Sequence, residues 1–574
     1  MIWWLENPTR ARSERQSVAD LAERVNWLRG VRWYLSNGAA LAVDFEIEHD
    51  GESVPLTMTY AEFHPNAPPI VVPRDGSRLS SHQYGAGGNL CLEYRADNWE
   101  TTITGAMMIE SAHRLITGER DVDGPELPSA HAVSLGQSVR GSYFRFLLTP
   151  PLEERLKAIE PGQSVEIGVA EKHHAETFTV TVAEIDGATD MRAWPAGIRE
   201  MTKRGHGIRL PAGTAMPATA QDSIASLLGD LGLAVLREQA LATSGEMDLV
   251  LVSGTEIAHF YAYDGSQKRY FGRSRTLKVG AGSRLPDDYA VLAQKSVGIV
   301  GCGSLGSKVA AMLARAGVRQ FTLADDDVLF AANLVRNELG AAAIGAHKVD
   351  ALCARLIEIA GTIDVTVRRV ALGGQESADT TDSVMSALRA CDVIIDATAD
   401  AHCFNFCAAV AKESLKPLVW GEVFAGGIGG MVARVRSGHE PEPQTARNQI
   451  NAWCDAHGIP APLAGFAAPY ATEAGDGVPL VADDAEVAII GGHVARLAAD
   501  VLIRPDDSAF PMPAYAIGLR RAWIFSEPFE TWPIQLVGSE PWKVEQDPAS
   551  VAESLELLRE LLPSAFDGHD QSSK

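Results

Sequence analysis

Three glycines in the string GCGSLG have the spacing of a phosphate-binding turn. Gly301, Gly303 and Gly306 follow the apolar run SVGIV and open the alanine-rich stretch SKVAAMLARAG. In a strand–turn–helix unit of this kind, backbone amides and the helix N-terminus receive phosphate oxygens. Asp325 ends the next apolar run, where a dinucleotide-binding enzyme also places the acid that holds a ribose. These residues predict a nucleotide site, but they do not separate NAD from ATP.

Charged and amide side chains further along favour a triphosphate. Asn333, Arg336 and Lys348 follow the acids Asp325 and Asp327 in the string DDDVLFAANLVRNELGAAAIGAHKV. Attack on the α-phosphate of ATP expels pyrophosphate, whose charge must be taken up by cations and amide donors. Arg336 and Lys348 supply such cations, whereas hydride transfer requires neither. The spacing therefore favours nucleotidyl transfer from ATP.

This segment resembles the ThiF/MoeB and ubiquitin-activating adenylyltransferase family, over most of residues 291–535. The family pattern is a Gly-rich loop, D-x-D, N-L-x-R-Q and then G-x-x-K. The matching positions are the GCGSLG loop, Asp325, Asp327, Asn333, Leu334, Arg336, Gly345 and Lys348. Asn337 stands where the family usually has Gln. The magnesium motif D-x-T-D-N is DATAD here, with Asp396 at the first acid and the second displaced to Asp400. The resemblance implies ATP and Mg²⁺ as cofactors, with Asp396 at the nucleotide and both acids as metal ligands.

A second region, around Cys91, resembles the active site of ubiquitin-conjugating enzymes. In that family a P-x-x-PP turn ends a strand, a Gly lies three residues before the catalytic Cys, a Leu follows it, and a Trp lies eight after. The matching residues are Pro65, Pro68, Pro69, Gly88, Cys91, Leu92 and Trp99. The resemblance implies that Cys91 carries an acyl group as a thioester until an amine attacks it.

The oxyanion-stabilising HPN element of that family has two candidate positions. The string His64-Pro65-Asn66 looks like it but lies in the wrong place relative to Cys91. Counted back from Cys91, the element falls near His82, and Gln83 most nearly replaces its Asn. Whether Gln83 reaches the oxyanion stays open.

An activating enzyme of this kind also needs a thiol of its own after the adenylation strands. Cys403 and Cys407 stand at i and i+4 of one helix, a spacing that also suits a metal but lacks other ligands. Cys454 lies in the polar, proline-bounded segment EPEPQTARNQINAWCDAHGIPAP, and His457 one turn away would lower its pKa toward the thiolate. Cys454 is therefore the predicted activating thiol. The other cysteines are assigned to packing: Cys302, Cys353, Cys391, Cys403 and Cys407.

The elements that must position these groups fall into three predicted regions of a multidomain α/β protein. Residues 1–152 form a ubiquitin-conjugating-like α+β domain, with a polar helix near 11–30 and strand-like runs ALAVDFEIEHD and SVPLTMTYAEF. Residues 153–290 are a mixed middle region, a linker or an inactive adenylation-like domain, with strands at FTVTVAEI, MDLVLVSG and AHFYAYD. Residues 291–574 form a Rossmann-like ThiF-type domain with a parallel sheet and crossover helices, an amphipathic helix VAESLELLRELL and a polar tail.

Composition limits the classes of function. The chain has 574 residues, more than one hydrophobic core supports, with 46% hydrophobic and 22% charged residues as in ordinary globular proteins. A net charge of -24 argues against a nucleic-acid partner. No apolar run is long enough for a membrane span or a secretion signal, so we expect a cytoplasmic protein. Seven cysteines without a CxxC pair do not suggest a disulfide framework.

As a whole, the chain resembles bacterial fusions of a conjugating domain to an activating domain, best known from antiphage cyclic-oligonucleotide signalling operons. The resemblance implies ATP-dependent activation of the C-terminus of a ubiquitin-like or cGAS-like protein, thioester transfer and ligation to a target amine, by a homodimer. Two alternatives stay open. One is a sulfur-carrier or peptide adenylyltransferase whose N-terminal module only recruits substrate. The other is a non-catalytic scaffold that senses a nucleotide.

Overall fold

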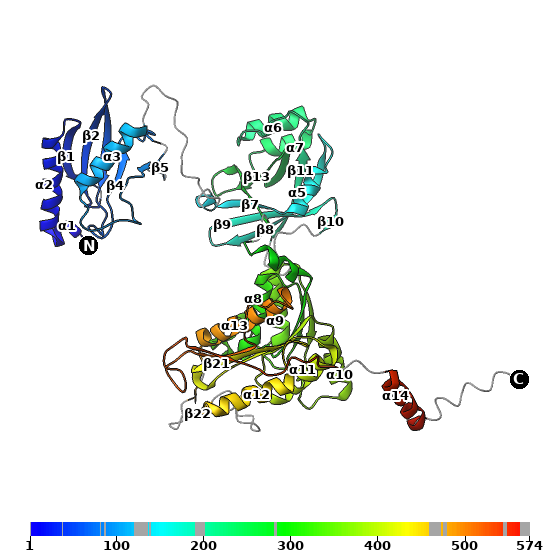
Figure 1. The fold of residues 1–574 in the computed structure, drawn as a ribbon. Coiled ribbons are helices and arrows are strands. Elements are labelled where there is room, and N and C mark those ends of the chain that lie inside the picture. The colour runs from blue at the N-terminus through cyan, green and yellow to red at the C-terminus, as the bar shows by residue number, and fades with distance from the viewer. Residues whose placement is uncertain are drawn as a thin grey trace. The chain divides into compact units, whose positions relative to one another are not determined.

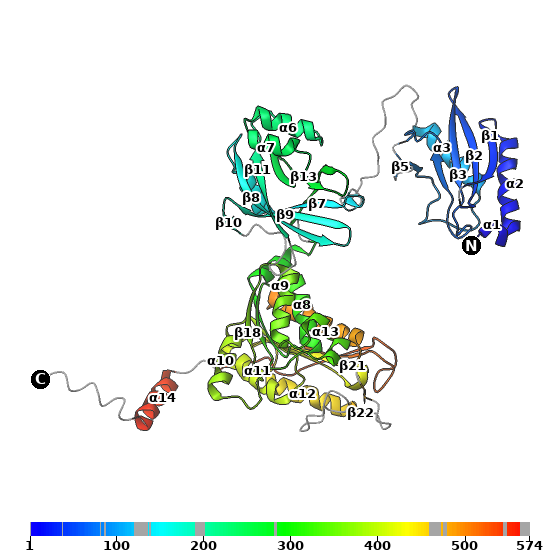
Figure 2. The same ribbon diagram turned by 180° about the vertical axis from the view of Figure 1, so that it is seen from behind.

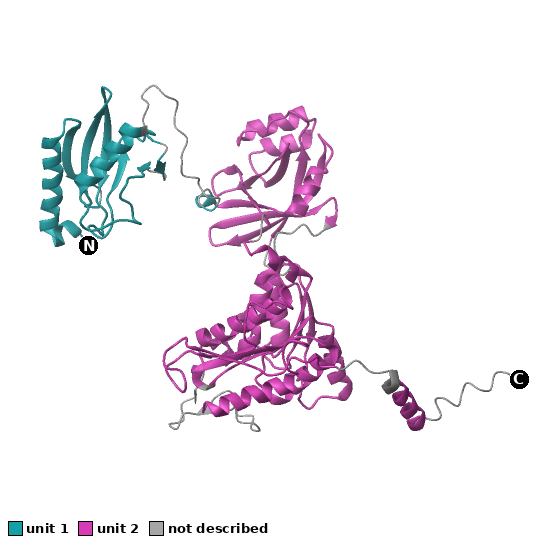
Figure 3. Cartoon of the chain, in the orientation of Figure 1, with its two compact units in different colours: residues 1–142 teal, residues 143–574 magenta. Residues whose placement is uncertain are grey.

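The computed structural model describes most of the chain as two compact units, residues 1–142 and 143–574 (Figure 3). The described residues are 2–36, 38–80, 82–84, 88–119, 136, 139–189, 201–280, 284–458, 472–473, 479–480, 482–543 and 548–562. Helices and large sheets alternate along them, as the predicted α/β class requires. The predicted three-domain division is finer than these two units and stays a prediction.

The first unit packs helices against an antiparallel sheet of order β1-β2-β3-β4 (Figure 1). Its elements are α1 Trp3–Glu6, α2 Pro8–Arg24, β1 Leu28–Leu35, β2 Leu41–His49, β3 Glu52–Thr59, β4 Ile70–Pro73, β5 Gln83–Tyr84, β6 Asn89–Leu90 and α3 Gly105–Glu119. The helix expected near 11–30 is wrong at its end, because α2 stops at Arg24 and Leu28 already pairs with Ile47 of β2. The strand-like runs predicted after it are β2 and β3.

A nine-stranded sheet opens the second unit, with strand order β14-β13-β12-β11-β8-β9-β7-β15 and β10 beside β9. Its strands are β7 Phe144–Leu148, β8 Ser164–His174, β9 Thr177–Ile185, β10 Ala188–Thr189, β11 Met201–Arg209, β12 Met247–Ser253, β13 Glu256–Asp264, β14 Arg269–Arg273 and β15 Arg275–Lys278. The helices are α5 Pro150–Lys157, α6 Gln221–Asp230 and α7 Ala234–Leu241. The three predicted strands of this region are β9, β12 and β13. Because the region has buried apolar cores of its own, it is a folded part of the chain.

The two edges of this sheet are consecutive in sequence and meet at Ser274. β14 pairs with β13, whereas β15 pairs with β7, so the sheet closes on itself where β14 passes into β15. The Ser274 amide donates to the His259 carbonyl at 2.9 Å. The buried His259 ring bridges Ser274 Oγ at 2.9 Å and Asp248 Oδ1 at 3.0 Å. These contacts join β12, β13 and the seam.

The second large sheet has the order β18-β17-β16-β19-β20-β21-β24-β25, and β18 to β20 run parallel as predicted. Its strands are β16 Ser296–Val300, β17 Gln320–Ala324, β18 Asp364–Arg368, β19 Val393–Asp396, β20 Leu418–Val423, β21 Gly429–Val435, β24 Ala514–Gly518 and β25 Thr531–Ile534. A small hairpin is formed by β22 Thr472–Glu473 and β23 Pro479–Leu480. The 3-10 turns are η1 Asp287–Gln294, η2 Ala331–Val335, η3 Ala341–Ala343 and η4 Ala425–Gly427.

Helices cover both faces of this sheet (Figures 1 and 2). On one face lie α8 Ser304–Ala316, α9 Lys348–Ala360 and α13 Asp484–Ile503. On the other lie α10 Ala378–Arg389, α11 Ala401–Ser414 and α12 Pro443–Ala456. The predicted C-terminal helix is α14 Pro548–Leu561, and the polar tail after it lies outside the described residues. Within the described part of the chain, no helix has both the length and the apolar composition to cross a bilayer.

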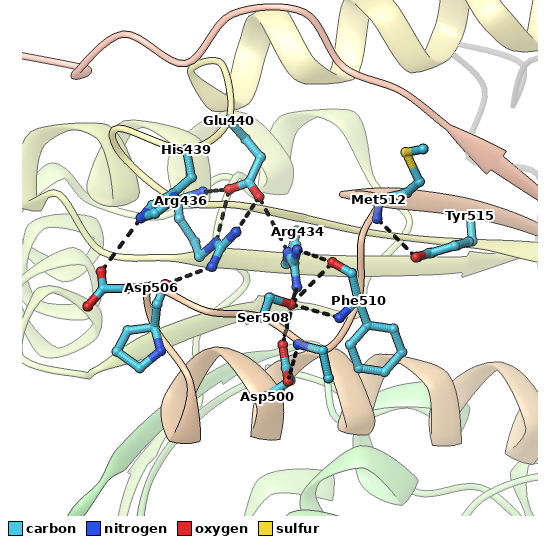
Figure 4. Close-up of polar contacts among 12 residues, drawn as sticks. Arg434, Arg436, His439, Glu440, Asp500, Asp506, Ser508, Phe510, Met512 and Tyr515 are labelled. Carbon is cyan, nitrogen blue, oxygen red and sulfur yellow. Dashed lines mark hydrogen bonds and ion pairs between the residues drawn. The ribbon is translucent and has the colours of Figure 1, made fainter.

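A buried ionic network connects β21 to the C-terminal end of α13 (Figure 4). Arg434 is buried, with its Nη1 at 3.3 Å from Asp500 of α13 and its Nη2 donating to the Phe510 carbonyl at 2.8 Å. Glu440 lies between two guanidinium groups, 3.5 Å from Arg434 Nε and 2.7 Å from Arg436 Nη2. Every charge in the network has a counter-charge, which offsets part of the cost of burial, but burial still lowers the pKa of Arg434.

Candidate active site

The predicted site residues converge at the carboxyl ends of β16, β17 and β19. Val300 pairs with Ala324 and with Asp396, so the segments that follow the first two strands start level with the end of β19. After β16 the chain continues into α8 on one face, and after β19 into α11 on the other. In open parallel sheets, ligands bind where neighbouring strands are followed by connections to opposite faces of the sheet.

The glycines of the loop between β16 and α8 have distinct reasons to be glycine. Gly301 has φ +85°, which favours glycine, and a Cβ on Gly306 would lie 1.8 Å from the Gly301 carbonyl oxygen. Gly303 is the N-cap of α8, and a Cβ there would meet no protein atom within 4 Å. Gly301 and Gly306 thus close the turn onto the strand, while Gly303 leaves the helix N-terminus open to an approaching anion.

Asp325 ties the end of β17 to this loop. Its carboxylate accepts hydrogen bonds from the Cys302 amide at 2.6 Å and the Asp327 amide at 2.8 Å. Burial raises the pKa of Asp325. Lys348, at the start of α9, is buried and its ammonium pairs with the Asp327 carboxylate. The structure therefore brings Asp325, Asp327 and Lys348 together beside the glycine loop.

Asn333 and Arg336 lie on the segment between β17 and α9. The Asn333 side chain accepts a hydrogen bond from the Phe330 amide at 2.8 Å, at the start of η2. The backbone carbonyl of Asn333 accepts a hydrogen bond from the Arg336 amide at 3.2 Å. Arg336 itself is half-buried. Asn337 is buried and accepts from the Leu339 amide at 3.0 Å. These amides fix the course of the segment that carries Arg336.

A small cavity of about 30 Å³ adjoins the end of β19. Asp396, Asp400, Glu422 and Arg447 line it, together with apolar residues of α11, β20 and α12. Burial raises the pKa of Asp396 to about 6 and that of Glu422 to about 7. The Arg447 guanidinium lies over the Phe404 ring, 4.5 Å from its centroid.

Glu422 and Arg447 are absent from the predicted site. The sequence could have indicated Glu422, because it is a single acid inside the apolar strand LVWGEVF and buried acids are rare unless they are paired. No local sequence pattern marked Arg447, because α12, which carries it, is far along the chain from the other residues that line the cavity.

The two predicted metal ligands both line this cavity. Asp396 accepts from Thr398 Oγ1 at 2.6 Å and from the Thr398 amide at 3.0 Å, and Asp400 caps α11 through the Cys403 amide at 2.9 Å. Across the described residues, no three His, Cys, Asp or Glu side chains are grouped to hold a metal. Two carboxylates nevertheless suit Mg²⁺, which takes most of its other ligands from water and phosphate oxygens.

Cys454 lies on the buried face of α12, and the prediction that its pKa is lowered is wrong. Its thiol is buried beside Ile450, and burial together with the Glu422 carboxylate raises its pKa to about 11. His457 does not counter this effect, because its ring stacks on Trp453 and its Nδ1 lies 2.7 Å from the Trp453 carbonyl oxygen. The polar residues that suggested an exposed segment lie on the other face of α12. The end of that segment, 459–462, lies outside the described residues.

The remaining cysteines agree with the packing prediction, except that one is partly exposed. Cys302, Cys391, Cys403 and Cys407 are buried, and Cys353 is half-buried on α9.

In the first unit, Cys91 follows the short hairpin of β5 and β6 and is half-buried. Its amide donates to the His82 carbonyl at 2.7 Å. The Gln83 amide nitrogen donates to the carbonyls of Ser77 at 3.0 Å and Gly88 at 2.9 Å. Gln83 therefore holds the loop that precedes Cys91, and its part in stabilising an oxyanion stays a prediction.

The HPN-like string of the first unit contacts α2 and the segment after Cys91. His64 is buried, with Nε2 3.4 Å from the buried Glu14 carboxylate and its ring against Trp3. Trp99 Nε1 donates to the Pro65 carbonyl at 2.7 Å. These contacts connect α2, the proline turn and the segment after Cys91.

Comparisons with known proteins match the part of the chain that carries this site. Residues 280–507 match the ThiF family. The uncharacterized protein y4oA of Sinorhizobium fredii is 33% identical over 187 residues, 30% of this chain and 31% of that protein. The uncharacterized protein y4qC of the same organism is 26% identical over 382 residues, 59% and 63% of the two chains. This chain thus spans less than two thirds of the length of either relative.

Solved structures that match part of this chain include E. coli MccB with ATP, with a TM-score of 0.33 and 14% identity over 44% of this chain and 67% of that chain. PaaA has a TM-score of 0.34 and 16% identity over 44% and 75% of the two chains. The part of this chain that carries the glycine loop, the paired acids and Lys348 is a ThiF-family domain.

Proposed function

We propose that the ThiF-family domain uses ATP to adenylate the C-terminal carboxylate of a protein or peptide. The observation that carries the proposal is the convergence of the glycine loop, the Asp327–Lys348 pair and Asp396 at the ends of three adjacent parallel strands. A carboxylate oxygen attacks the α-phosphorus, the bond to the α,β-bridging oxygen breaks, and pyrophosphate leaves. The acyl adenylate remains.

Individual residues have separate parts in this step. The amides at Gly303 and the N-terminus of α8 receive phosphate oxygens, and Asp325 binds the ribose. Arg336 and Lys348 take up the charge that develops on pyrophosphate. Asn333 keeps Arg336 in position through η2. Asp396 and Asp400 would hold Mg²⁺, which neutralises phosphate charge when bound.

In the second stage of the proposal, the acyl group moves to sulfur. The Cys454 thiolate attacks the acyl carbon and releases AMP, and Cys91 then takes the acyl group by thioester exchange. A target amine finally attacks the Cys91 thioester, forms an amide and regenerates the thiol. The matched proline turn, Gly88 and Trp99 around Cys91 support this assignment of the first unit.

The wider setting follows from the same resemblance. The activated protein would be ubiquitin-like or cGAS-like, in a cytoplasmic bacterial conjugation system of antiphage defence, and the enzyme would act as a homodimer. Neither nucleic acid nor membrane is a proposed partner.

Two assays test the two stages separately. The full chain with ATP, Mg²⁺ and a candidate ubiquitin-like protein should release pyrophosphate, and Arg336→Ala should abolish the release while Arg315→Ala, on the exposed surface of α8, should not. Unchanged release by Arg336→Ala would overturn the nucleotide assignment. Non-reducing electrophoresis should then show a thiol-sensitive adduct that needs both Cys91 and Cys454.

The raised pKa of Cys454 favours one rival, an adenylyltransferase that passes its adenylate on without a thioester at Cys454. In that case Cys454→Ala would release pyrophosphate and modify the target as the wild type does. Tight nucleotide binding without any pyrophosphate would instead support a sensing scaffold.

A further inference from the structure

The cavity at the end of β19 contains one cation among several acids. Of the described residues that line it, Arg447 alone carries a positive charge, whereas Asp396, Asp400 and Glu422 are acids. The charge of Arg447 acts on two of them, because it lowers the pKa values of Asp396 and Glu422 and so opposes the effect of burial. A further carboxylate that entered the cavity would be repelled by these acids unless it met the guanidinium.

The guanidinium of Arg447 has donors available for a ligand. Within the described part of the chain it forms no ion pair, and it donates one long hydrogen bond, to the Ala401 carbonyl at 3.4 Å. An arginine side chain carries five N–H donors in a planar fork. Most of them are therefore left for a group that enters the cavity.

Aromatic side chains fix the orientation of this guanidinium. It lies 4.5 Å from the centroid of the Phe404 ring. Phe404 is buried and meets Trp420, which lines the cavity, with ring centroids 5.2 Å apart and the rings edge to face. The helix that carries Arg447 is tied to α11, since Gln444 Nε2 donates to Asn405 Oδ1 at 2.8 Å. Because Arg447 is held in place in advance, a ligand loses less of its binding energy in ordering it.

Arg447 and the predicted phosphate-binding residues belong to opposite faces of the sheet. The helices α8 and α9 pack on one face, and α11 and α12 pack on the other (Figures 1 and 2). In the proposed adenylation, the attacking and leaving oxygens lie roughly in line on opposite sides of the α-phosphorus. Arg336 and Lys348 assign pyrophosphate to the side of α9. The attacking carboxylate then belongs to the side of Arg447.

The free space in the cavity suits a small group. Its volume of about 30 Å³ holds little more than two water-sized groups, since each needs roughly 10–15 Å³. The two oxygens of a carboxylate fit such a space, whereas a bulky side chain does not. Asn451, four residues after Arg447 on α12, also lines the cavity and is exposed. The end of a polypeptide can therefore reach the guanidinium past Asn451.

From these observations we infer that Arg447 binds the C-terminal carboxylate of the protein that is adenylated. This inference rests on the proposed function and adds to it the residue that recognises the acceptor. The planar fork of the guanidinium matches the two carboxylate oxygens. One oxygen stays hydrogen-bonded to Arg447 while the other attacks the α-phosphorus and pyrophosphate leaves.

Calorimetry with two forms of one acceptor tests this role on the full chain. The probe is the candidate ubiquitin-like protein that supports pyrophosphate release, prepared with a free C-terminal carboxylate or with a C-terminal carboxamide. Mg²⁺ and α,β-methylene-ATP fill the nucleotide site without turnover. The wild type should bind the carboxylate form at least about tenfold more tightly, because hydrogen bonds between two charged groups are the strong ones. Arg447→Met should lose most of this preference and bind the carboxamide form as the wild type does.

Three variants control for charge and folding. Arg447→Gln should also lose the preference, so that the result does not depend on the folding of one variant. Arg447→Lys keeps the charge without the fork and should retain part of the preference. Arg389→Met removes an arginine from the exposed end of α10, outside the cavity, and should retain all of it.

The outcomes separate this inference from the proposed function. Pyrophosphate release by the wild type, together with a full carboxylate preference in Arg447→Met and Arg447→Gln, would overturn the inference alone. A tenfold loss of ATP affinity in these variants with the preference intact would also overturn it, because the guanidinium would then bind a phosphate. If the wild type releases no pyrophosphate with any candidate, the proposed function falls and this inference falls with it.

Discussion

Burial sets the ionisation of two acids at the candidate site. Asp396 is 3% exposed, and its pKa is raised to about 6, while that of Glu422 is raised to about 7. Both carboxyls line the cavity with Arg447, whose positive charge opposes part of the shift. An ordinary aspartate would be fully ionised well below neutral pH. The charge of this cavity therefore changes within the range where enzymes work.

Replacement of Asp396 by Asn should stabilise the C-terminal domain at pH 7.5 but not at pH 4, while abolishing pyrophosphate release. The folded-state pKa of about 6 exceeds the ordinary value of 3.8, so the folded state binds the proton more tightly. Ionisation of Asp396 thus lowers stability as pH rises through this interval, by on the order of 3 kcal/mol when complete. Urea unfolding at the two pH values measures the difference. Asp400→Asn, which keeps the helix cap, is the control. Equal stabilisation at both pH values would contradict the ionic explanation.

Cys454 should react slowly with iodoacetamide at neutral pH, because burial and Glu422 hold its pKa near 11. Glu422→Gln removes the nearby negative charge, lowers the pKa of the thiol and should speed labelling several-fold at pH 8. The measurement is mass spectrometry of the Cys454 peptide over time, with the buried Cys407 as an internal control that should stay unlabelled in both proteins. An unchanged rate in Glu422→Gln would mean that access, and not ionisation, limits the reaction.

At the scale of the elements, different glycines of the strand–loop–helix unit of β16 and α8 are required for packing and for binding. Gly306→Ala brings a methyl group against the Gly301 carbonyl and should destabilise the domain by more than about 2 kcal/mol. Gly303→Ala meets open space and should change stability by less than about 1 kcal/mol, yet weaken ATP binding, since the methyl group occupies the approach to the helix N-terminus. Thermal unfolding and calorimetric ATP titration distinguish the two effects. Normal ATP affinity in Gly303→Ala would argue against phosphate at this loop.

The contact between β21 and α13 depends on Arg434. Arg434→Met should destabilise the domain by about 3 kcal/mol, because Asp500 and Glu440 each lose one of two counter-ions, while Arg504 and Arg436 stay paired with them. The double variant Arg434→Met with Asp500→Leu should recover part of that loss, since the acid that has lost a counter-ion is removed with it. Chemical unfolding of both variants is the measurement. No recovery in the double variant would mean that the packing of Arg434, and not its charge, stabilises this contact.

Local periodicity predicted many of the elements. It did not predict where every element ends or which distant segments pack together. Alternating apolar residues identified β9, β12 and β13, and the glycine loop located the β16–α8 unit. The end of α2 was missed, because Trp27 and Leu28 continue the apolar spacing of a helix. The burial of Cys454 could not be predicted, because the sequence of this polar segment does not show which face of its helix is buried. Arg447 reaches Asp396 only through the packing of α11 against α12, which no local pattern encodes.

At the scale of the whole molecule, the boundary at residue 142 predicts where the activities can be separated. A chain of residues 143–574 should fold and release pyrophosphate, whereas it should form no adduct at the missing Cys91. A chain beginning at 153 should unfold more easily, because it lacks β7, which pairs with β9 and β15. Pyrophosphate release and circular dichroism of the two truncated chains measure this. Equal stability of the two would show that β7 is dispensable.

The closed sheet of the second unit also determines when this protein can finish folding during synthesis. β7 must wait for β15, which lies roughly 130 residues later in the chain, before its outer edge is paired. Until Lys278 has left the ribosome, β7 presents an open edge to other nascent chains, as does β13 until Arg273 of β14 has left. The first unit, whose strands pair with near neighbours in sequence, is complete long before then. Slow translation before residue 278 would therefore prolong a stage at which the unpaired edges of this sheet are exposed to misassembly.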